Sequence, residues 1–160
     1  MSTLDHQKEE KNESVRKARG MRFAIVAAQW NREITQPLWE GARDTLIECG
    51  AREEDICTSW VAGSFELIYG AARYVKKHQV DAVIILGSVV RGETPHFDYI
   101  CSGVTQGIAR LNVEGDIPVI FGLLTTNDME QARERAGGAL GNKGSECALT
   151  AIDMVTEFER

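Results

Sequence analysis

The sequence lacks the cysteine spacings of a metal site or a disulfide framework. Its four cysteines, Cys49, Cys57, Cys101 and Cys147, lie far apart, form no CxxC pair and have no histidine at a ligand spacing. This distribution argues against a zinc site and against a disulfide-stapled domain. We therefore expect no metal, and we expect the cysteines to act as small apolar core residues.

The chain also lacks an excess of positive charge and any long apolar run. It carries 18 basic and 24 acidic residues, for a formal net charge of −6, which disfavours nucleic acid or an anionic membrane as a partner. No window reaches the length of a membrane span. Residues 1–20 contain no signal-peptide core, and their acidic residues disfavour a transit sequence. We expect a cytoplasmic protein that acts on small molecules.

The two common nucleotide-binding fingerprints are absent as well. No GxGxxG occurs, and the glycine-rich segment 137–144 lacks the Gly-Lys-Ser/Thr ending of a P-loop. A nicotinamide or nucleoside triphosphate role therefore has no support. The segment still suits a phosphate, because its backbone N–H groups open the last predicted helix near Arg133, Arg135 and Lys143.

What is present is a regular alternation of short apolar runs and segments with helical spacing. A chain of 160 residues has room for one domain, and we expect a flexible tail at 1–20 before a domain at 21–160. The pattern predicts strands at 23–28, 56–61, 83–86 and 119–124, and helices at 33–49, 65–77, 97–113, 128–136 and 144–158. This order predicts a three-layer α/β/α sandwich with a central four-stranded parallel sheet and a flavodoxin-like strand order.

One strand-and-loop unit, Asp81–Asp98, holds the most chemistry-bearing residues. Its apolar run is typical of a strand buried on both faces, and we expect Gly87 to end that strand. His96 then lies where the strand passes into a helix, just beyond the carboxyl edge at which open α/β sheets bind ligands. A loop histidine that only hydrogen-bonds to backbone is the alternative interpretation.

Polar and aromatic side chains follow every predicted strand, and the carboxyl ends of parallel strands share one edge. The four segments are Gln29–Asn31, Ala62–Glu66, Gly87–His96 and Thr125–Asn127. Each also has a purely structural explanation. Trp30 is explained as a staple against the next helix, and Ser64 with Glu66 as a helix start. Their coincidence at one edge favours a binding site.

Together these residues resemble the lumazine synthase family from Arg22 to Phe158. The block from Arg91 to His96, which reads RGETPH, is the most specific part. The matching motifs are, in order, Trp30-Asn31, Gly63–Glu66, Gly87–Tyr99, Phe121–Thr126, Glu130–Ala132, Arg135–Gly137 and Gly141–Gly144.

The resemblance implies the penultimate step of riboflavin biosynthesis. In that step 5-amino-6-(D-ribitylamino)uracil condenses with 3,4-dihydroxy-2-butanone 4-phosphate to 6,7-dimethyl-8-ribityllumazine, phosphate and water, without a cofactor. Imine formation, phosphate elimination and ring closure all move protons. The resemblance assigns this role to His96, because an imidazole with an unperturbed pKa of about 6.5 can donate and accept near neutrality.

The resemblance also implies the binding residues. Trp30 would stack on the pyrimidine, Glu66 would accept hydrogen bonds from hydroxyls, and Arg135 would anchor the phosphate. The implied set for the ribitylaminouracil is Trp30, Ser64, Phe65, Glu66, Ser88, Val89, Val90 and Phe121. The implied set for the butanone phosphate is Glu93, Thr94, Arg135 and Lys143.

In the family, the positions matching Phe121, Arg135 and Lys143 come from an adjacent subunit of a five-membered ring, so a monomer should be inactive. Many members assemble twelve such rings into a 60-subunit icosahedral shell, while others stop at the pentamer. The short 137–144 connection favours that shell here. Riboflavin synthase is a further implied partner.

Two departures from the family pattern stand out. Ala62 replaces the usual proline, which leaves that turn without a fixed φ. Trp30 replaces the usual phenylalanine, and we hypothesise that its larger face favours flavin binding. A non-catalytic flavin or lumazine binder, or a storage shell, is the second hypothesis, but it has no need of His96, Arg135 and Lys143. A flavodoxin-like electron carrier is the third hypothesis. This sequence lacks the phosphate-binding loop that such a carrier has after its first strand.

Overall fold

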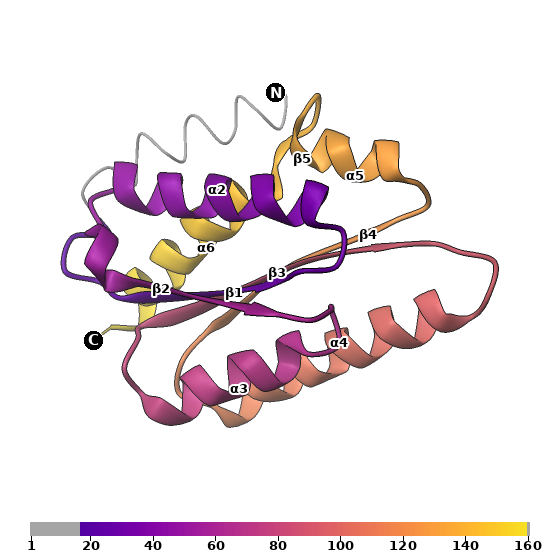
Figure 1. Cartoon of the computed structure of the whole chain (residues 1–160). Coiled ribbons are helices and arrows are strands. Elements are labelled where there is room, and N and C mark those ends of the chain that lie inside the picture. The colour runs from indigo at the N-terminus through magenta and orange to yellow at the C-terminus, as the bar shows by residue number, and fades with distance from the viewer. Residues whose placement is uncertain (1–16, 160) are drawn as a thin grey trace.

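A four-stranded parallel sheet lies at the centre of the computed structural model, which describes residues 17–159 (Figure 1). The sheet order is β2-β1-β3-β4, which confirms the predicted flavodoxin-like order. The strands are β1 (Phe23–Ala28), β2 (Ile56–Val61), β3 (Ala82–Val90) and β4 (Val119–Thr126). Most of the predicted tail lies outside the described residues. In its last part, residues 17–20 form a turn in which Ala18 is buried.

Helices cover both faces of the sheet, as predicted for a three-layer sandwich. Figure 1 shows α2, α5 and α6 on one side and α3 and α4 on the other. The five predicted helices are present, with ends within two residues of the predicted ones. They are α2 (Arg32–Glu48), α3 (Leu67–Lys77), α4 (His96–Glu114), α5 (Met129–Arg135) and α6 (Lys143–Phe158). Two short additions were not predicted: the 3₁₀ helix η1 (Glu53–Asp55), and a hairpin of β5 (Ala136–Gly138) and β6 (Gly141–Asn142) before α6.

Strand β1 shows why the sequence forms two cores. All six of its residues are fully buried, because a central strand of a covered parallel sheet has no solvent face. Phe23, Ile25 and Ala27 pack in the core beneath α2 and α6. The alternate residues pack in the core above α3 and α4. Each large side chain buried in this way stabilises the fold by about 1.5–3 kcal/mol.

Strand β3 is longer than predicted. It continues through Gly87 to Val90 and pairs with β4 over its whole extended part, up to Val90↔Thr126. The prediction that Gly87 ends the strand is therefore wrong. A Cβ at Gly87 would lie 2.8 Å from Leu123 Cδ1, so the glycine allows close packing within the strand. The extra residues bring Ser88, Val89 and Val90 to the carboxyl edge.

The cysteines differ in their surroundings. Cys49 and Cys147 are buried, whereas Cys57 is exposed and Cys101 is half-buried. The prediction of apolar core residues is thus confirmed for Cys49 and Cys147 and wrong for Cys57. Among the helices of the described residues, none has the length and apolar character needed to cross a membrane.

Candidate functional site

A cavity of about 550 Å³ lies at the carboxyl ends of β1, β2 and β3. Its volume suits a small organic ligand. Three of the four segments predicted to share this edge meet there, and the fourth, Thr125–Asn127, does not line the cavity. The lining residues are Trp30, Asn31, Ala62, Gly63, Ser64, Phe65, Glu66, Ser88, Val89, Val90, His96 and Ile100.

The loop after β1 presents Trp30 to this cavity. Its backbone is tied to the loop after β2, because the N–H of Gln29 donates to Val61 O (2.8 Å) and that of Trp30 to Ala62 O (3.1 Å). The indole itself is 71% exposed. That exposure contradicts the staple explanation and leaves the aromatic face open to a ligand.

The segment after β2 contributes an aromatic ring and a carboxylate. Phe65 is half exposed, and its ring lies against α4, where a Cβ on Gly103 would be 3.0 Å from it. Glu66 occupies the N-cap position of α3 but makes no side-chain capping hydrogen bond. The carboxylate therefore does not cap the helix by a hydrogen bond, although it lies at the positive end of the α3 dipole, and Glu66 also lines the cavity. Ser64, in the same segment, is buried and lines the cavity.

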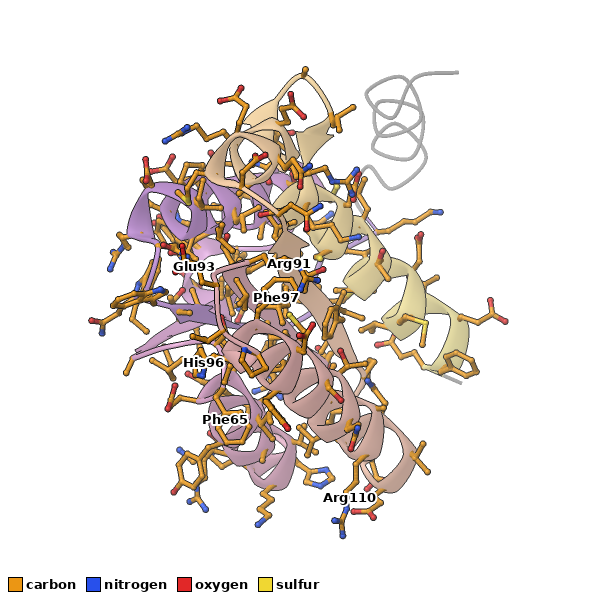
Figure 2. All side chains as sticks on the ribbon, turned by 90° about the vertical axis from the view of Figure 1, so that its right-hand side faces the viewer. Phe65, Arg91, Glu93, His96, Phe97 and Arg110 are labelled. Carbon is orange, nitrogen blue, oxygen red and sulfur yellow. The ribbon has the colours of Figure 1, made fainter. Side chains whose placement is uncertain are left out.

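His96 is the first residue of α4 and follows the N-cap residue Pro95. Figure 2 shows His96 and Phe65 on the same face of the molecule, and both line the cavity. Ile100, one turn further along α4, adds an apolar wall. An exposed imidazole at the rim of a cavity can exchange protons with both a ligand and water.

Arg91 ties down the segment that precedes His96. Its backbone N–H donates to Thr126 O (2.9 Å) and its Nε to Asn127 Oδ1 (3.2 Å). Its Nη1 lies 3.4 Å from Asp98 Oδ1 on α4. Glu93 and Thr94 lie in the loop between Arg91 and His96, both exposed, and neither lines the cavity.

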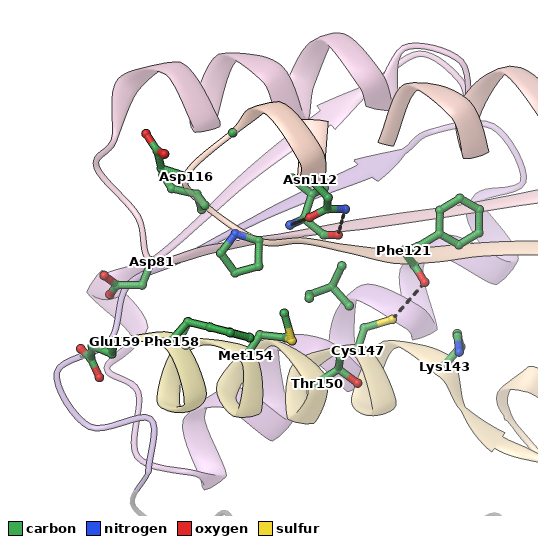
Figure 3. A pocket seen from close by; sticks show the side chains of 16 residues that line it. Asp81, Asn112, Asp116, Phe121, Lys143, Cys147, Thr150, Met154, Phe158 and Glu159 are labelled. Carbon is green, nitrogen blue, oxygen red and sulfur yellow. Dashed lines mark hydrogen bonds between the residues drawn. The ribbon is translucent and has the colours of Figure 1, made fainter. Parts of the chain in front are cut away.

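The remaining predicted residues lie elsewhere. Phe121 and Lys143 line a second cavity of about 800 Å³ between β4 and α6 (Figure 3). Arg135 lies at the end of α5 and lines neither cavity. It nevertheless shares an ion-pair partner with Lys143. Arg135 Nη2 lies 3.6 Å and Lys143 Nζ lies 3.4 Å from the same atom, Glu146 Oε2. Two cations that share one carboxylate leave a net positive charge there.

The thiol of Cys147 faces this second cavity and donates weakly to Phe121 O at 3.7 Å (Figure 3). Burial raises the pKa of Cys147 to about 12, so the side chain stays a neutral thiol and is no nucleophile near neutral pH. Among residues 17–159, no group of three or more His, Cys, Asp or Glu side chains has the arrangement of a metal site.

The sequence motifs did not single out three residues of this region. Ile100 was recognisable, because it lies one helical turn after His96. Asn31 was part of the segment after the first strand and of the Trp30-Asn31 motif, but no role was assigned to it. Arg91 was part of the RGETPH block, but its contacts join segments far apart in the chain, which no local pattern reveals.

Comparisons with known proteins agree on one family. The family model described as 6,7-dimethyl-8-ribityllumazine synthase matches residues 20–159. A protein of that name from Phocaeicola vulgatus is 60% identical over 147 residues, which are 92% of this chain and 88% of the relative. One from Bacteroides fragilis is 58% identical over 84% of this chain and 94% of its own length. One from Porphyromonas gingivalis is 57% identical over 89% of this chain and 88% of its own length.

Proposed function

The chain belongs to the 6,7-dimethyl-8-ribityllumazine synthase family, and we propose that the cavity at the ends of β1, β2 and β3 is the part of the active site that one copy contributes. The protein is an enzyme, a transferase of riboflavin biosynthesis. It condenses 5-amino-6-(D-ribitylamino)uracil with 3,4-dihydroxy-2-butanone 4-phosphate to 6,7-dimethyl-8-ribityllumazine. The observation that carries the site proposal is the meeting of aromatic, carboxylate and imidazole side chains around one cavity.

The ribitylaminouracil binds in this cavity. Trp30 stacks on the pyrimidine, where a flat aromatic face offers contact area at little entropic cost. Ser64, Phe65 and Glu66 hold the ring and the ribityl chain, with the carboxylate of Glu66 accepting from hydroxyls. Ser88, Val89 and Val90 contribute main-chain groups from the extended end of β3.

His96 transfers the protons of the reaction. The amine of the uracil attacks the ketone of the butanone, water leaves as the imine forms, and phosphate then departs by elimination. Each step needs a group that takes or gives a proton at the reacting atoms. The support for His96 is its position at the rim of the cavity, at the start of α4.

The phosphate is held by the pair of cations on Glu146. Arg135 offers a fork that matches phosphate oxygens, and Lys143 adds a point charge. Glu93 and Thr94 meet the butanone from the loop before His96. Phe121 completes the pyrimidine pocket.

Because Phe121, Arg135 and Lys143 lie away from the His96 cavity in one chain, they act on the cavity of an adjacent copy. The assembly is a ring of five such copies, and the short 137–144 connection supports the closure of twelve rings into a 60-subunit shell. Riboflavin synthase, which consumes the product, is a partner of that assembly, and the cytoplasm is its location.

Steady-state kinetics with both substrates test the proposal, with lumazine fluorescence as the readout. We expect His96→Ala to lower kcat by about a hundredfold or more. We expect Arg135→Ala to raise KM for the butanone phosphate and to leave KM for the ribitylaminouracil nearly unchanged. A catalytically silent wild type would support the non-catalytic binder instead, and unchanged kinetics in both variants would overturn the assigned roles.

A further inference from the structure

Strand β3 extends beyond its neighbour β1. The last pair between these strands is Ala27↔Leu86, whereas β3 continues to Val90 and remains paired with β4 to its end. Ser88–Val90 therefore have a strand on one side only. The other side is the floor of the His96 cavity, which Ser88, Val89 and Val90 line.

The direction of the main-chain groups in this stretch follows from the hydrogen bonds at its two ends. The N–H groups of Val83 and Arg91 donate to Pro118 O and Thr126 O on the β4 side. Because successive residues of a strand point their N–H and C=O groups to opposite edges, the even-numbered residues face the β1 side. Ser88 O and the N–H and C=O of Val90 thus face the gap that β1 leaves.

The side chain of Asn31 fills the first position in that gap. Its Nδ2 donates to Ser88 O at 2.9 Å, across 57 residues of sequence. Asn31 is the N-cap residue of α2 and has a left-handed backbone (φ 58°, ψ 48°), yet its side chain makes no capping bond to its own helix. Its main-chain carbonyl holds the helix start instead, accepting from the N–H groups of Ile34 and Thr35.

The hydrogen bond from Asn31 to Ser88 O also restrains the backbone next to Trp30. The backbone of Trp30 is joined to the loop after β2 through Ala62 O, and the next residue, Asn31, is joined to β3. The indole is 71% exposed, so neighbouring side chains do little to fix it. Its orientation over the cavity depends on these two anchors.

We propose that Asn31 is a positioning and specificity-determining residue of this site, which engages Ser88 O and aligns Trp30 over the free main-chain edge of Val90. Because Ser88 O already accepts a hydrogen bond from Asn31, the groups left for a ligand are one donor, the N–H of Val90, and one acceptor, its C=O. That pair matches the imide edge of a uracil ring, where an N–H lies beside a carbonyl. The inference rests on the proposed function, because it assigns the uracil ring to this cavity.

Two substitutions separate the side chain of Asn31 from its backbone. Asn31→Asp keeps the size, tolerates the left-handed conformation and is as good an N-cap, but a carboxylate cannot donate to Ser88 O. Asn31→Gly keeps the backbone conformation and removes the side chain. The control is Gln36→Ala, on the same helix, whose side chain hydrogen-bonds with Arg32 and Glu40, one turn before and one turn after it.

Kinetics and direct binding of 6,7-dimethyl-8-ribityllumazine, followed by its own fluorescence, give the readout. Without the bond from Asn31 to Ser88 O, the misalignment of Trp30 predicts about a tenfold rise in KM for the ribitylaminouracil and in Kd for the lumazine in both variants. KM for the butanone phosphate should stay close to wild type, and the melting temperature should fall by only a few degrees, because one internal hydrogen bond is lost. Gln36→Ala should match wild type in every measurement.

The outcomes separate the two proposals. If wild type is active and both Asn31 variants bind the uracil substrate and the lumazine as wild type does, the inference about Asn31 is overturned and the proposed function stands. Equal rises in KM for both substrates would overturn it too, because they would indicate a general structural role. If wild type itself does not form lumazine, the proposed function fails first.

Discussion

The guanidinium carbon of Arg91 lies 4.3 Å from the centre of the Phe97 ring (Figure 2), directly beside His96 in the chain. This stacking places a cation over an aromatic face, an arrangement that contributes about 0.5–1 kcal/mol at exposed sites. The same guanidinium reaches Asn127 and Asp98. Arg91 therefore connects the loop of Glu93 and Thr94 to two elements of the scaffold at once.

We predict that Arg91→Ala lowers kcat by about tenfold or more, because small displacements of a reacting group are costly. The melting temperature should change little, since the ion pair of Arg91 is exposed and such pairs contribute about 0–1 kcal/mol. Steady-state kinetics and a thermal melt measure both effects. Arg91→Lys should recover only part of the rate, because an ammonium cannot bond Asn127 and Asp98 while stacking on Phe97.

Arg52→Ala is the matched control for that prediction. Arg52 is likewise exposed and pairs with the two carboxylates of Glu54 and Asp55, but it lies before β2, away from the carboxyl edge of the sheet. Its removal should leave kcat within about twofold, as surface pairs contribute little. If Arg91→Ala behaved like Arg52→Ala, the loop would not need this support.

Trp30 leads to a prediction about flavin. Its exposed indole lines the cavity, and an aromatic pair contributes about 0.5–1.5 kcal/mol beyond the buried area. We predict saturable binding of riboflavin, weakened by about threefold to tenfold in Trp30→Phe. The fluorescence of riboflavin itself measures the affinity without relying on tryptophan emission.

Trp60→Phe serves as the control for flavin binding. Trp60 packs near Trp39, with ring centres 6.1 Å apart, and lies beneath the guanidinium of Arg32, outside the cavity lining. Its replacement should leave the affinity unchanged. An absence of saturable binding to wild type would remove the flavin hypothesis.

The sequence predicted the fold well where local pattern and tertiary pairing agree. β1 and β2 begin and end at the predicted residues. The apolar run of β1 is bounded by Arg22 and Gln29, and the more mixed run of β2 follows Asp55 and ends shortly before Gly63. β3 was predicted too short, because its end is determined by pairing with β4, whose residues lie 36 positions further along the chain. A glycine has no local signal that distinguishes close packing from a turn.

The candidate site was predictable only in part. The gathering of the segments after β1, β2 and β3 followed from the parallel sheet alone. Phe121 and Lys143 line a different cavity, which becomes visible only in the folded chain. No local pattern indicated this separation, and only the family resemblance implied that these residues do not serve the cavity of their own chain. The bond from Asn31 to Ser88 depends on a left-handed backbone and a contact across 57 residues, which propensity does not encode.

The buried thiol of Cys147 should make the free energy of unfolding depend on pH. Burial raises the pKa of its thiol from 9.0 to about 12 in the folded chain. Folding therefore favours the protonated thiol, so this contribution to stability is fully present below pH 9 and is lost as the pH rises toward about 12. Above pH 9, wild type should lose about 1 kcal/mol per pH unit more than Cys147→Ala does. Urea unfolding at pH 8, 9 and 10 measures the difference.

Alkylation provides a second measure of the same thiol. At pH 9 iodoacetamide should modify the exposed Cys57 in the native protein and spare Cys147, because only the thiolate reacts. Cys147 should react once urea unfolds the chain. Early modification of Cys147, or identical pH slopes for wild type and Cys147→Ala, would show that the thiol is not held neutral.

The proposed sharing of the active site between copies predicts that two impaired variants restore each other when activity is measured at a butanone phosphate concentration well below the raised KM of Arg135→Ala. Where His96→Ala and Arg135→Ala chains assemble at random in equal amounts, about a quarter of the interfaces should combine an intact His96 from one copy with an intact Arg135 from the next. Co-assembly of the two variants should therefore regain up to that share of wild-type activity. The control mixes His96→Ala with Trp30→Ala. Both of those residues line the same cavity of one chain, so every interface lacks one of them, and the activity of the mixture should not rise above that of the two variants measured separately. Recovery in the control, or none in the first mixture, would contradict a site built from two copies.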